Sequence, residues 1–122
     1  MTIGEVAGRT GFRTSALRYY ETTGLLEPAL RVSDRRLYDE SAIDRLTVIR
    51  FCRQLDFTLD EIRLLLTEPR GRRQKARWRE LVDVKVVELD ETLARVRAMK
   101  KVLLVSRDCD CVDVQECAAA CS

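Results

Sequence analysis

The sequence predicts a mainly α-helical protein in which a small helical head is followed by one long helix and a short cysteine-rich tail. Only five of the 122 residues are Gly and two are Pro, while 46% are apolar and 34% are charged. This composition is typical of a soluble helical protein and not of a disordered or fibrous chain. Apolar residues also recur at the helical period in several segments, and one long stretch near the C-terminal end contains neither Gly nor Pro.

Two short helices are expected at the start of the chain. Thr2, followed three residues later by a glutamate, fits a capping box and predicts a helix over about residues 3–9. Thr14 or Ser15 can cap a second helix, and Gly24 lies where a left-handed residue would end it. Two short helices joined by a tight turn predict a helix-turn-helix.

The next segment, residues 29–38, is expected to form a two-stranded hairpin, or wing. It shows no helical periodicity, contains three arginines and carries a polar turn at Ser33 and Asp34. A third helix follows, capped by Asp39 or Ser41, whose apolar positions at nearly helical spacing are Ile43, Leu46, Ile49 and Leu55.

A fourth helix is predicted to begin after Thr58, because Thr58 and Glu61 repeat the capping-box spacing. The Pro69 and Gly71 that follow should end this helix. From about residue 74 to 105 the apolar positions alternate in steps of four and three, and Lys100 breaks this pattern once. They are Val82, Val86, Leu89, Leu93, Val96 and Leu103. A helix of about 30 residues would extend roughly 45 Å, so its apolar stripe needs a partner helix, and a coiled-coil dimer is expected.

The charge distribution favours a polyanionic partner for the first part of the chain. Residues 1–79 carry 16 Lys and Arg against 11 Asp and Glu, whereas residues 80–122 carry 6 against 9. The second helix places Ser15, Arg18 and Tyr19 on or near one face, which suits the major groove of DNA. Arginines of the wing would neutralise the flanking phosphates, and these are Arg31, Arg35 and Arg36.

Four of the five cysteines crowd into the last 14 residues, where they are candidate ligands of an inorganic species. They are Cys109, Cys111, Cys117 and Cys121. Four thiolates without any histidine suit Cu(I), Zn, Cd, Hg or an iron–sulfur cluster. Cys52 lies apart from them and is interpreted as a packed core residue, as is Trp78.

Other classes of protein find little support in the sequence. The chain has no histidine, no glycine-rich phosphate loop and no nucleophile beside a base, so it is not expected to be an enzyme. No apolar run approaches the length of a membrane span and no signal peptide is evident, so a cytoplasmic protein without a membrane partner is expected. A passive metal-buffering or electron-transfer protein remains an alternative, although it would leave the arginine-rich head unexplained.

Five separated motifs resemble the MerR family of transcriptional regulators, and they occur in the family's order. They are Thr2–Ala7, Leu17–Glu21, Gly24–Leu26, Arg36–Tyr38 and Phe57–Ile62. The resemblance covers about residues 1–70, and the long helix and cysteine tail continue it. It implies a winged helix-turn-helix DNA-binding head over residues 1–70, an antiparallel dimerisation helix over 72–106 and a cysteine-rich sensor loop over 107–122.

The resemblance also implies residue roles and a mechanism. Arg18 and Tyr19 would lie in the recognition helix, and Arg36 and Tyr38 would sit in the wing on the phosphates. The homodimer would bind double-stranded promoter DNA together with RNA polymerase. It would activate transcription by kinking and untwisting the DNA.

Two branches of the family compete for the cysteines. The metal-ion sensors use paired cysteines in this loop with a spacing like that of Cys109 and Cys117, although the cysteine that their divalent-metal members place at the start of the dimerisation helix is missing here. The redox-sensing, SoxR-like branch has a C-x-C-x5-C run that Cys109, Cys111 and Cys117 reproduce. Ser106 stands where its first cluster cysteine would fall, so a [2Fe-2S] cluster would need Cys121. The metal-ion branch is favoured.

Overall fold

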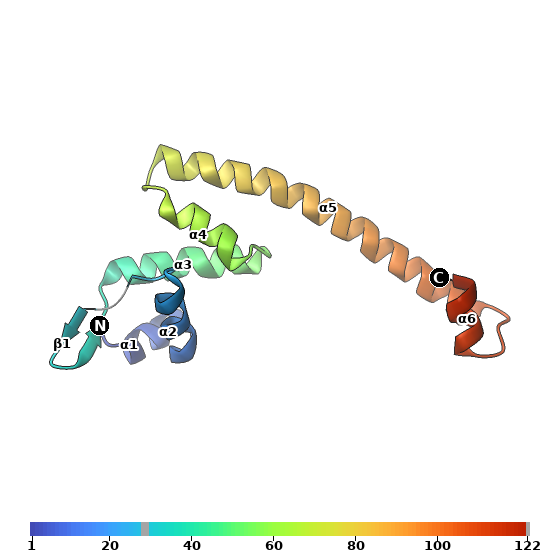
Figure 1. Cartoon of the computed structure of the whole chain (residues 1–122), viewed down its shortest axis with the longest axis horizontal. Coiled ribbons are helices and arrows are strands. Elements are labelled where there is room, and N and C mark those ends of the chain that lie inside the picture. Colours follow the sequence, from blue (N-terminus) through green and yellow to red (C-terminus); the bar gives the residue numbers. More distant parts are fainter. Residues whose placement is uncertain (28–29, 122) are drawn as a thin grey trace. The chain divides into compact units, whose positions relative to one another are not determined.

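The computed structural model of the chain describes residues 1–27 and 30–121, apart from the side chains of Arg36 and Cys121. It forms two compact units, residues 1–81 and the part from Val82 onwards. The first unit contains the helical head with a hairpin, and the second contains most of the long helix and a short terminal helix (Figure 1). The predicted mainly helical fold is confirmed.

The head begins with α1 (Ile3–Thr10) and α2 (Thr14–Thr23). The predicted capping box at Thr2 is present, with Glu5 as its second member. Gly24 ends α2 with a φ of 81°, the left-handed conformation that an L side chain rarely adopts. The cap of α2 differs from the prediction: Arg13 is the N-cap and Thr14 is the first helical residue, with no side-chain hydrogen bond at this end.

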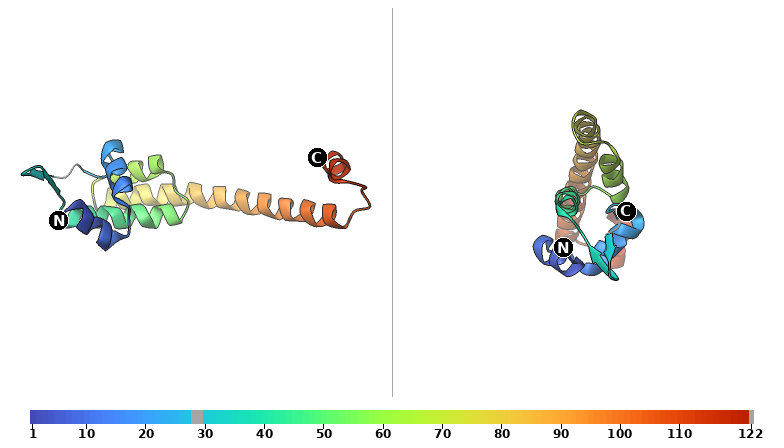
Figure 2. Two further views of the ribbon diagram at one scale, coloured as in Figure 1. Left: turned by 90° about the horizontal axis from the view of Figure 1, so that it is seen from below. Right: turned by 90° about the vertical axis from the view of Figure 1, so that its left-hand side faces the viewer.

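The expected wing is a hairpin of β1 (Leu30–Val32) and β2 (Arg35–Leu37), paired antiparallel with Arg31 opposite Arg36. Its two turn residues, Ser33 and Asp34, have φ values of 52° and 64°. Two consecutive left-handed residues match the right-handed twist of a two-residue hairpin, which explains the polar turn. Position 29 of the predicted segment lies outside the described residues. The hairpin extends from one end of the head (Figures 1 and 2).

Two further helices complete the head, α3 (Glu40–Gln54), capped by Asp39, and α4 (Leu59–Thr67), capped by Thr58. Together with α1 and α2 they enclose one apolar core. Its largest fully buried side chains are Leu17, Leu25, Leu26, Leu46, Ile49, Ile62, Val6 and Cys52. The face of α2 that carries Leu17 is therefore occupied by packing, and its opposite face is left to solvent.

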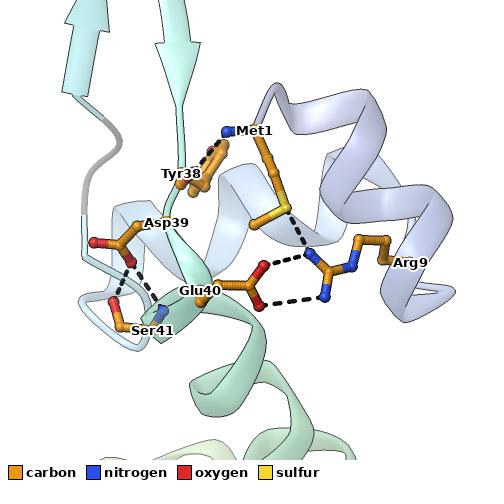
Figure 3. A network of polar contacts seen from close by, with 6 residues as sticks. All are labelled: Met1, Arg9, Tyr38, Asp39, Glu40 and Ser41. Carbon is orange, nitrogen blue, oxygen red and sulfur yellow. Dashed lines mark hydrogen bonds and ion pairs between the residues drawn. The ribbon is translucent and has the colours of Figure 1, made fainter.

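A polar network ties the wing to the helices at its base (Figure 3). Arg9 of α1 donates to both carboxylate oxygens of Glu40, at 2.7 and 3.2 Å, and so joins α1 to the start of α3. The backbone of Met1 pairs with Tyr38 in both directions, each at 2.7 Å. The strand that leaves the wing is thus fixed against the beginning of the chain.

Two arginines of the head bind backbone carbonyls at helix ends. Arg50 donates to the carbonyl of Thr10 at the end of α1, and Arg63 donates to the carbonyl of Thr23 at the end of α2, the latter at 2.6 Å. Carbonyls at the end of a helix lack partners within the helix, so guanidinium groups from α3 and α4 stabilise them.

The long helix α5 (Arg72–Asp108) has 37 residues and is a turn longer than predicted. In the second unit its predicted seam is largely uncovered: Leu89, Leu93 and Val96 are each about half exposed. The tail is not the simple loop that the sequence suggested, because residues 114–121 form α6 (Val114–Cys121), which follows a turn after α5 (Figure 1). Among the described residues, none of the helices combines the length and apolar character needed to cross a membrane.

Candidate metal centre and nucleic-acid interface

Three of the predicted cysteines meet at one point of the second unit. The Sγ atoms of Cys109, Cys111 and Cys117 all lie within 4.8 Å of one another, and the sulfurs of Cys109 and Cys117 are 3.0 Å apart. Each of the three is half-buried. Cys109 follows the last residue of α5, Cys111 lies in the turn, and Cys117 lies on α6. The turn between the two helices therefore creates the cluster.

Capping of α6 explains how the chain folds back at this turn. The carboxylate of Asp113 accepts from the backbone N–H of Glu116 at 2.9 Å, and the side chain of Glu116 accepts from the N–H of Val112 at 3.0 Å. This reciprocal pattern fixes the first turn of α6 and with it the direction of the Cys117 side chain. The Asp-x-x-Glu spacing at residues 113–116 is the sequence signal that would have predicted this helix.

The end of α5 also takes part in the cluster through a backbone oxygen. The thiol of Cys109 donates to the carbonyl of Ser106 at 3.2 Å, and Cys117 Sγ lies 3.7 Å from the same oxygen. In a metal-free state the Cys109 thiol can therefore satisfy one of the carbonyls left over at the end of α5, while the Cys117 proton is directed at the sulfur of Cys109. The sulfur cluster and the last turn of the long helix are one connected structure.

The close approach of the thiols separates their proton affinities. Hydrogen bonding from Cys117 and from Cys111 lowers the pKa of Cys109, because it stabilises the thiolate. Cys117 donates in these contacts, so the hydrogen bonds with Cys109 and Cys111 hold its proton and raise the pKa of Cys117 to about 12. The cluster thus holds a thiolate at Cys109 more readily than at Cys117.

The sulfur arrangement fits a single soft cation. At a metal–sulfur distance of about 2.3 Å, two thiolates on one ion stand about 3.8–4.0 Å apart. The three sulfurs already lie within 4.8 Å of one another, and the Cys109–Cys117 pair would need to open by about 1 Å. Three thiolates without an imidazole ligand form a soft donor set that suits a thiophilic metal.

The remaining cysteines stand apart from this cluster in different ways. Cys121 is the last residue of α6, but its side chain lies outside the described residues, so its role as a ligand stays a prediction. Cys52 is 1% exposed in the core of the head, as the sequence analysis predicted, and burial raises its pKa. It therefore behaves as a small apolar residue.

The predicted DNA-reading face of α2 is open to solvent. Ser15, Arg18 and Tyr19 are exposed, and the spacing of three and four residues puts them on one side of the helix. On the wing, the side chains of Arg31 and Arg35 are exposed as well, whereas that of Arg36 is outside the described part of the chain. One set of exposed side chains comes from α2 and the other from the hairpin, as a winged helix-turn-helix requires.

Tyr38 differs from the expectation that it lies on the surface of the wing. Its side chain is only 6% exposed, and its hydroxyl donates to Oε1 of Glu21 on α2 at 2.6 Å. The phosphate contact of Tyr38 stays a prediction, since here the ring packs in the core and the hydroxyl has a carboxylate partner.

One further candidate was missed by the sequence analysis. Arg13, the N-cap of α2, is exposed and stands at the end of the helix where anions are favoured. The signal in the sequence is a basic residue directly before the second helix, whereas the predicted caps, Thr14 and Ser15, lie within the helix.

Family models match this arrangement over most of the chain. The model described as MerR HTH family regulatory protein matches residues 1–69, and the model described as MerR, DNA binding matches residues 43–105. The chain belongs to the MerR family. Because the matched relatives are described as transcriptional regulators, the prediction that the chain is not an enzyme is also confirmed.

Several relatives within the MerR family are similar over most of the chain. The HTH-type transcriptional regulator CueR of Salmonella typhi is 32% identical, over 96% of this chain and 87% of the relative. The mercuric resistance operon regulatory protein of Bacillus cereus is 32% identical, over 82% of this chain and 75% of that protein. The transcription regulator PbrR691 from Ralstonia metallidurans CH34, solved in complex with lead(II), is 35% identical with a TM-score of 0.78, covering 96% and 94% of the two chains.

Proposed function

We propose that this MerR-family chain is a metal-responsive transcriptional regulator that holds a soft cation on the thiolates of Cys109, Cys111 and Cys117. The observation that carries the proposal is the convergence of their three sulfurs within 4.8 Å. Cys121 would be a fourth or auxiliary ligand. Relatives whose names refer to mercuric resistance, or that were solved with lead(II), support a thiophilic metal.

The partner of the head is double-stranded promoter DNA. Arg18 and Tyr19 on α2 would enter the major groove, where arginine can pair with guanine, and Arg31 and Arg35 would lie along the phosphates. Their exposure supports this role. Arg36 is proposed as a further phosphate contact from its position opposite Arg31 in the hairpin. The expected Tyr38 contact is not part of the proposal.

The regulator would act as a homodimer joined through α5. Contact of the half-exposed seam of Leu89, Leu93 and Val96 with water is unfavourable. A second α5 packed antiparallel against this seam would bury it. A dimer also places two heads on one operator, so a palindromic site is expected.

A connection between the metal and the DNA is provided by the chain itself. A cation on the three thiolates removes the Cys109 thiol proton that binds the carbonyl of Ser106, so the last turn of α5 would adjust. Because α5 carries the dimer seam, this adjustment would shift the dimer between two forms with different effects on DNA. Activation would follow when the metal-loaded form distorts the promoter for RNA polymerase.

Titration of the purified, reduced, full-length protein with Cd(II), Hg(II), Cu(I) or Zn(II), one at a time, tests the site. We expect one metal ion per chain and the ultraviolet absorption of metal–thiolate bonds for at least one of them. Cys109→Ser, Cys111→Ser and Cys117→Ser should each weaken this binding, and Cys52→Ser is the matched control. In a promoter reporter the three loop variants should lose the response to metal while keeping basal DNA binding.

The outcomes distinguish the alternatives. Loop variants that still respond to metal would place the sensor elsewhere, and loop variants that lose DNA binding as well would make the loop structural. A coloured protein that contains iron and sulfide would select the redox-sensing alternative with a [2Fe-2S] cluster, which would need Cys121 as a fourth ligand. Failure to bind duplex DNA would favour passive metal buffering or electron transfer.

A further inference from the structure

Two sulfurs of the cysteine cluster, those of Cys109 and Cys117, lie closer together than two ligands of one metal ion can. They are 3.0 Å apart. A disulfide joins its sulfurs at about 2.05 Å, whereas two thiolates on one ion stand about 3.8–4.0 Å apart. The metal-free pair is therefore about 1 Å away from either state. Metal binding and disulfide formation would move the same two sulfurs in opposite directions.

The backbone holds the two cysteines in place from both sides of the turn. Cys109 directly follows α5, and its thiol donates to the carbonyl of Ser106 in the last turn of that helix at 3.2 Å. Cys117 lies near the start of α6, where its N–H donates to the carbonyl of Asp113 at 3.3 Å. Disulfide geometry is specific, so a pair that the fold holds in contact is favoured over other pairings of the same cysteines.

The pair is also accessible to small molecules in solution. Both side chains are half-buried, whereas Cys52 is 1% exposed in the core of the head. A bridge between Cys109 and Cys117 would close a loop of nine residues. A bridge across so short a loop stabilises a fold less than one across a long loop, and exposed bridges are the more readily reduced. Such a bond suits a reversible modification better than a permanent structural link.

We propose that Cys109 and Cys117 form a reversible disulfide within one chain when the metal-free protein meets a peroxide, and that this bridge excludes the metal. The inference rests on the proposed metal site and names a regulation of it. A metal ion is bound by thiolates, and a disulfide contains none, so oxidation removes two of the three ligands at once. Cys111 alone remains of the cluster. The oxidised chain would not respond to the cation, although its DNA-binding head, in the other compact unit, keeps its fold.

The reaction balances with hydrogen peroxide as its one co-reactant. The thiolate of one cysteine attacks a peroxide oxygen, the O–O bond breaks, and a sulfenic acid and a hydroxide form; the hydroxide takes up a proton and becomes water. The thiol of the second cysteine then attacks the sulfenic sulfur, the S–S bond forms, and the S–O bond breaks, so the hydroxyl group leaves with the thiol proton as a second water. Two electrons pass from the sulfurs to the peroxide. A dithiol reduces the bridge by exchange and becomes a disulfide itself.

Mapping of the linkages tests the pairing without any metal. Full-length protein is reduced, stripped with a chelator that is then removed, treated with one equivalent of hydrogen peroxide and quenched with iodoacetamide. Cleavage before each aspartate of the tail puts Cys109, Cys111 and Cys117 on separate peptides for mass spectrometry. We expect the Cys109–Cys117 linkage within one chain to exceed every other linkage about tenfold, because proximity raises the effective concentration of the two thiols. In guanidinium chloride this preference should disappear.

Variants show whether the bridge belongs to this pair. Cys117→Ser should abolish the linkage, and Cys109→Ser should do the same. Cys111→Ser is the matched control in the same turn, and it should leave the rate of the Cys109–Cys117 linkage unchanged. Cys52→Ser should also leave this rate unchanged, because its thiol is buried in the head.

Titration with Cd(II) measures the consequence for the metal site. The reduced protein should develop the ultraviolet absorption of cadmium–thiolate bonds, and the peroxide-treated protein should not. Treatment with dithiothreitol, followed by its removal, should restore the absorption. Cd(II) added before the peroxide should slow the linkage by about tenfold or more, because the ion holds the two sulfurs apart as ligands.

Two results would overturn the proposal. Linkages distributed alike in the folded protein and in guanidinium chloride would show that the fold does not select this pair. An oxidised protein that binds Cd(II) as tightly as the reduced protein would show that the bridge does not exclude the metal. Failure of the reduced protein to bind any metal would contradict the proposed metal site instead, and the linkage map, which contains no metal, distinguishes the two failures.

Discussion

The hydroxyl of Tyr38 donates to Oε1 of Glu21 at 2.6 Å, and this contact joins the end of the wing to α2. It holds together the two elements that the proposed DNA interface needs. Because Tyr38 is buried and Glu21 is half-buried, loss of the hydroxyl would leave a carboxylate with a missing donor.

Tyr38→Phe should therefore lower the free energy of unfolding by about 1–3 kcal/mol. Denaturant unfolding monitored by circular dichroism measures this change. Tyr19→Phe is the control, because Tyr19 is 55% exposed and its change should stay within about 0.5 kcal/mol. If Tyr38→Phe left stability unchanged but weakened DNA binding, Tyr38 would be a phosphate contact after all.

The two arginines proposed for different tasks on DNA should give different signatures. Arg18→Ala should cost about 1–3 kcal/mol on the cognate promoter and relax the preference for one base pair, if Arg18 reads a base. Arg31→Ala should weaken binding to all sequences alike and reduce the slope of affinity against salt by about 1. Fluorescence anisotropy at several salt concentrations measures both. Arg95→Ala, on α5, serves as the control, and a loss of affinity equal to that of Arg18→Ala would contradict the assignment.

The seam of α5 is tested by placing charges within it. Leu89→Glu combined with Leu93→Glu would bury unpaired carboxylates in the helix interface, so the dimer should dissociate or unfold. Analytical ultracentrifugation at micromolar concentration measures the change, and Glu91→Lys on the outer side of the same turn should leave the dimer intact. A wild-type protein that sediments as a monomer would show that the seam does not mediate dimerisation.

Local signals in the sequence predicted the helices well, because each rests on residues close together in the chain. The capping boxes at Thr2 and Thr58 and the turn at Ser33 and Asp34 specify their own backbone geometry, and all are present. The helix α6 was missed although Asp113 and Glu116 form a similar pattern. The four cysteines between residues 109 and 121 dominate this segment, and its helical signal is only one turn long.

Contacts between distant residues could not be predicted in this way. The excess of arginine in the first part of the chain suggested a polyanion, yet Arg50 and Arg63 bind helix ends 40 residues away. Nor does the sequence show that Tyr38 faces Glu21. The convergence of Cys109, Cys111 and Cys117 was predictable because nine residues hold all three, but the part played by the Ser106 carbonyl follows only from the way α5 ends.

Arg63→Met tests the structural role of these arginines. It keeps much of the apolar length of the side chain but removes the donor to the Thr23 carbonyl, which lies 2.6 Å away. Because a helix-end carbonyl loses its partner, the free energy of unfolding should fall by about 1–2 kcal/mol. Arg70→Met, at an exposed position outside the helices, is the control. Equal stabilities of the two variants in thermal unfolding would show that the hydrogen bond contributes nothing.

The thiols of the metal-free protein should differ in reactivity in an order set by their pKa values. Only the thiolate reacts with iodoacetamide, so the rate rises with pH until the pKa of the thiol is passed. The pKa of Cys109 is lowered by hydrogen bonding from Cys117, whereas that of Cys117 is raised to about 12 and that of Cys52 is raised by burial. Near neutral pH, Cys109 should therefore be alkylated first, and Cys117 and Cys52 later.

A second variant shows whether this order comes from the contact between the two sulfurs. In Cys109→Ser a hydroxyl replaces the sulfur that accepts the hydrogen bond from Cys117, and it is a weaker acceptor than a thiolate. Cys117 should therefore react faster than in the wild type. Cys52, in the core, should keep its slow rate. Peptide mapping by mass spectrometry after timed quenching measures each rate. Saturation with the cognate metal should protect Cys109, Cys111 and Cys117 together and leave Cys52 unaffected. Faster labelling of Cys117 than of Cys109 in the wild type would contradict the arrangement of donor and acceptor described here.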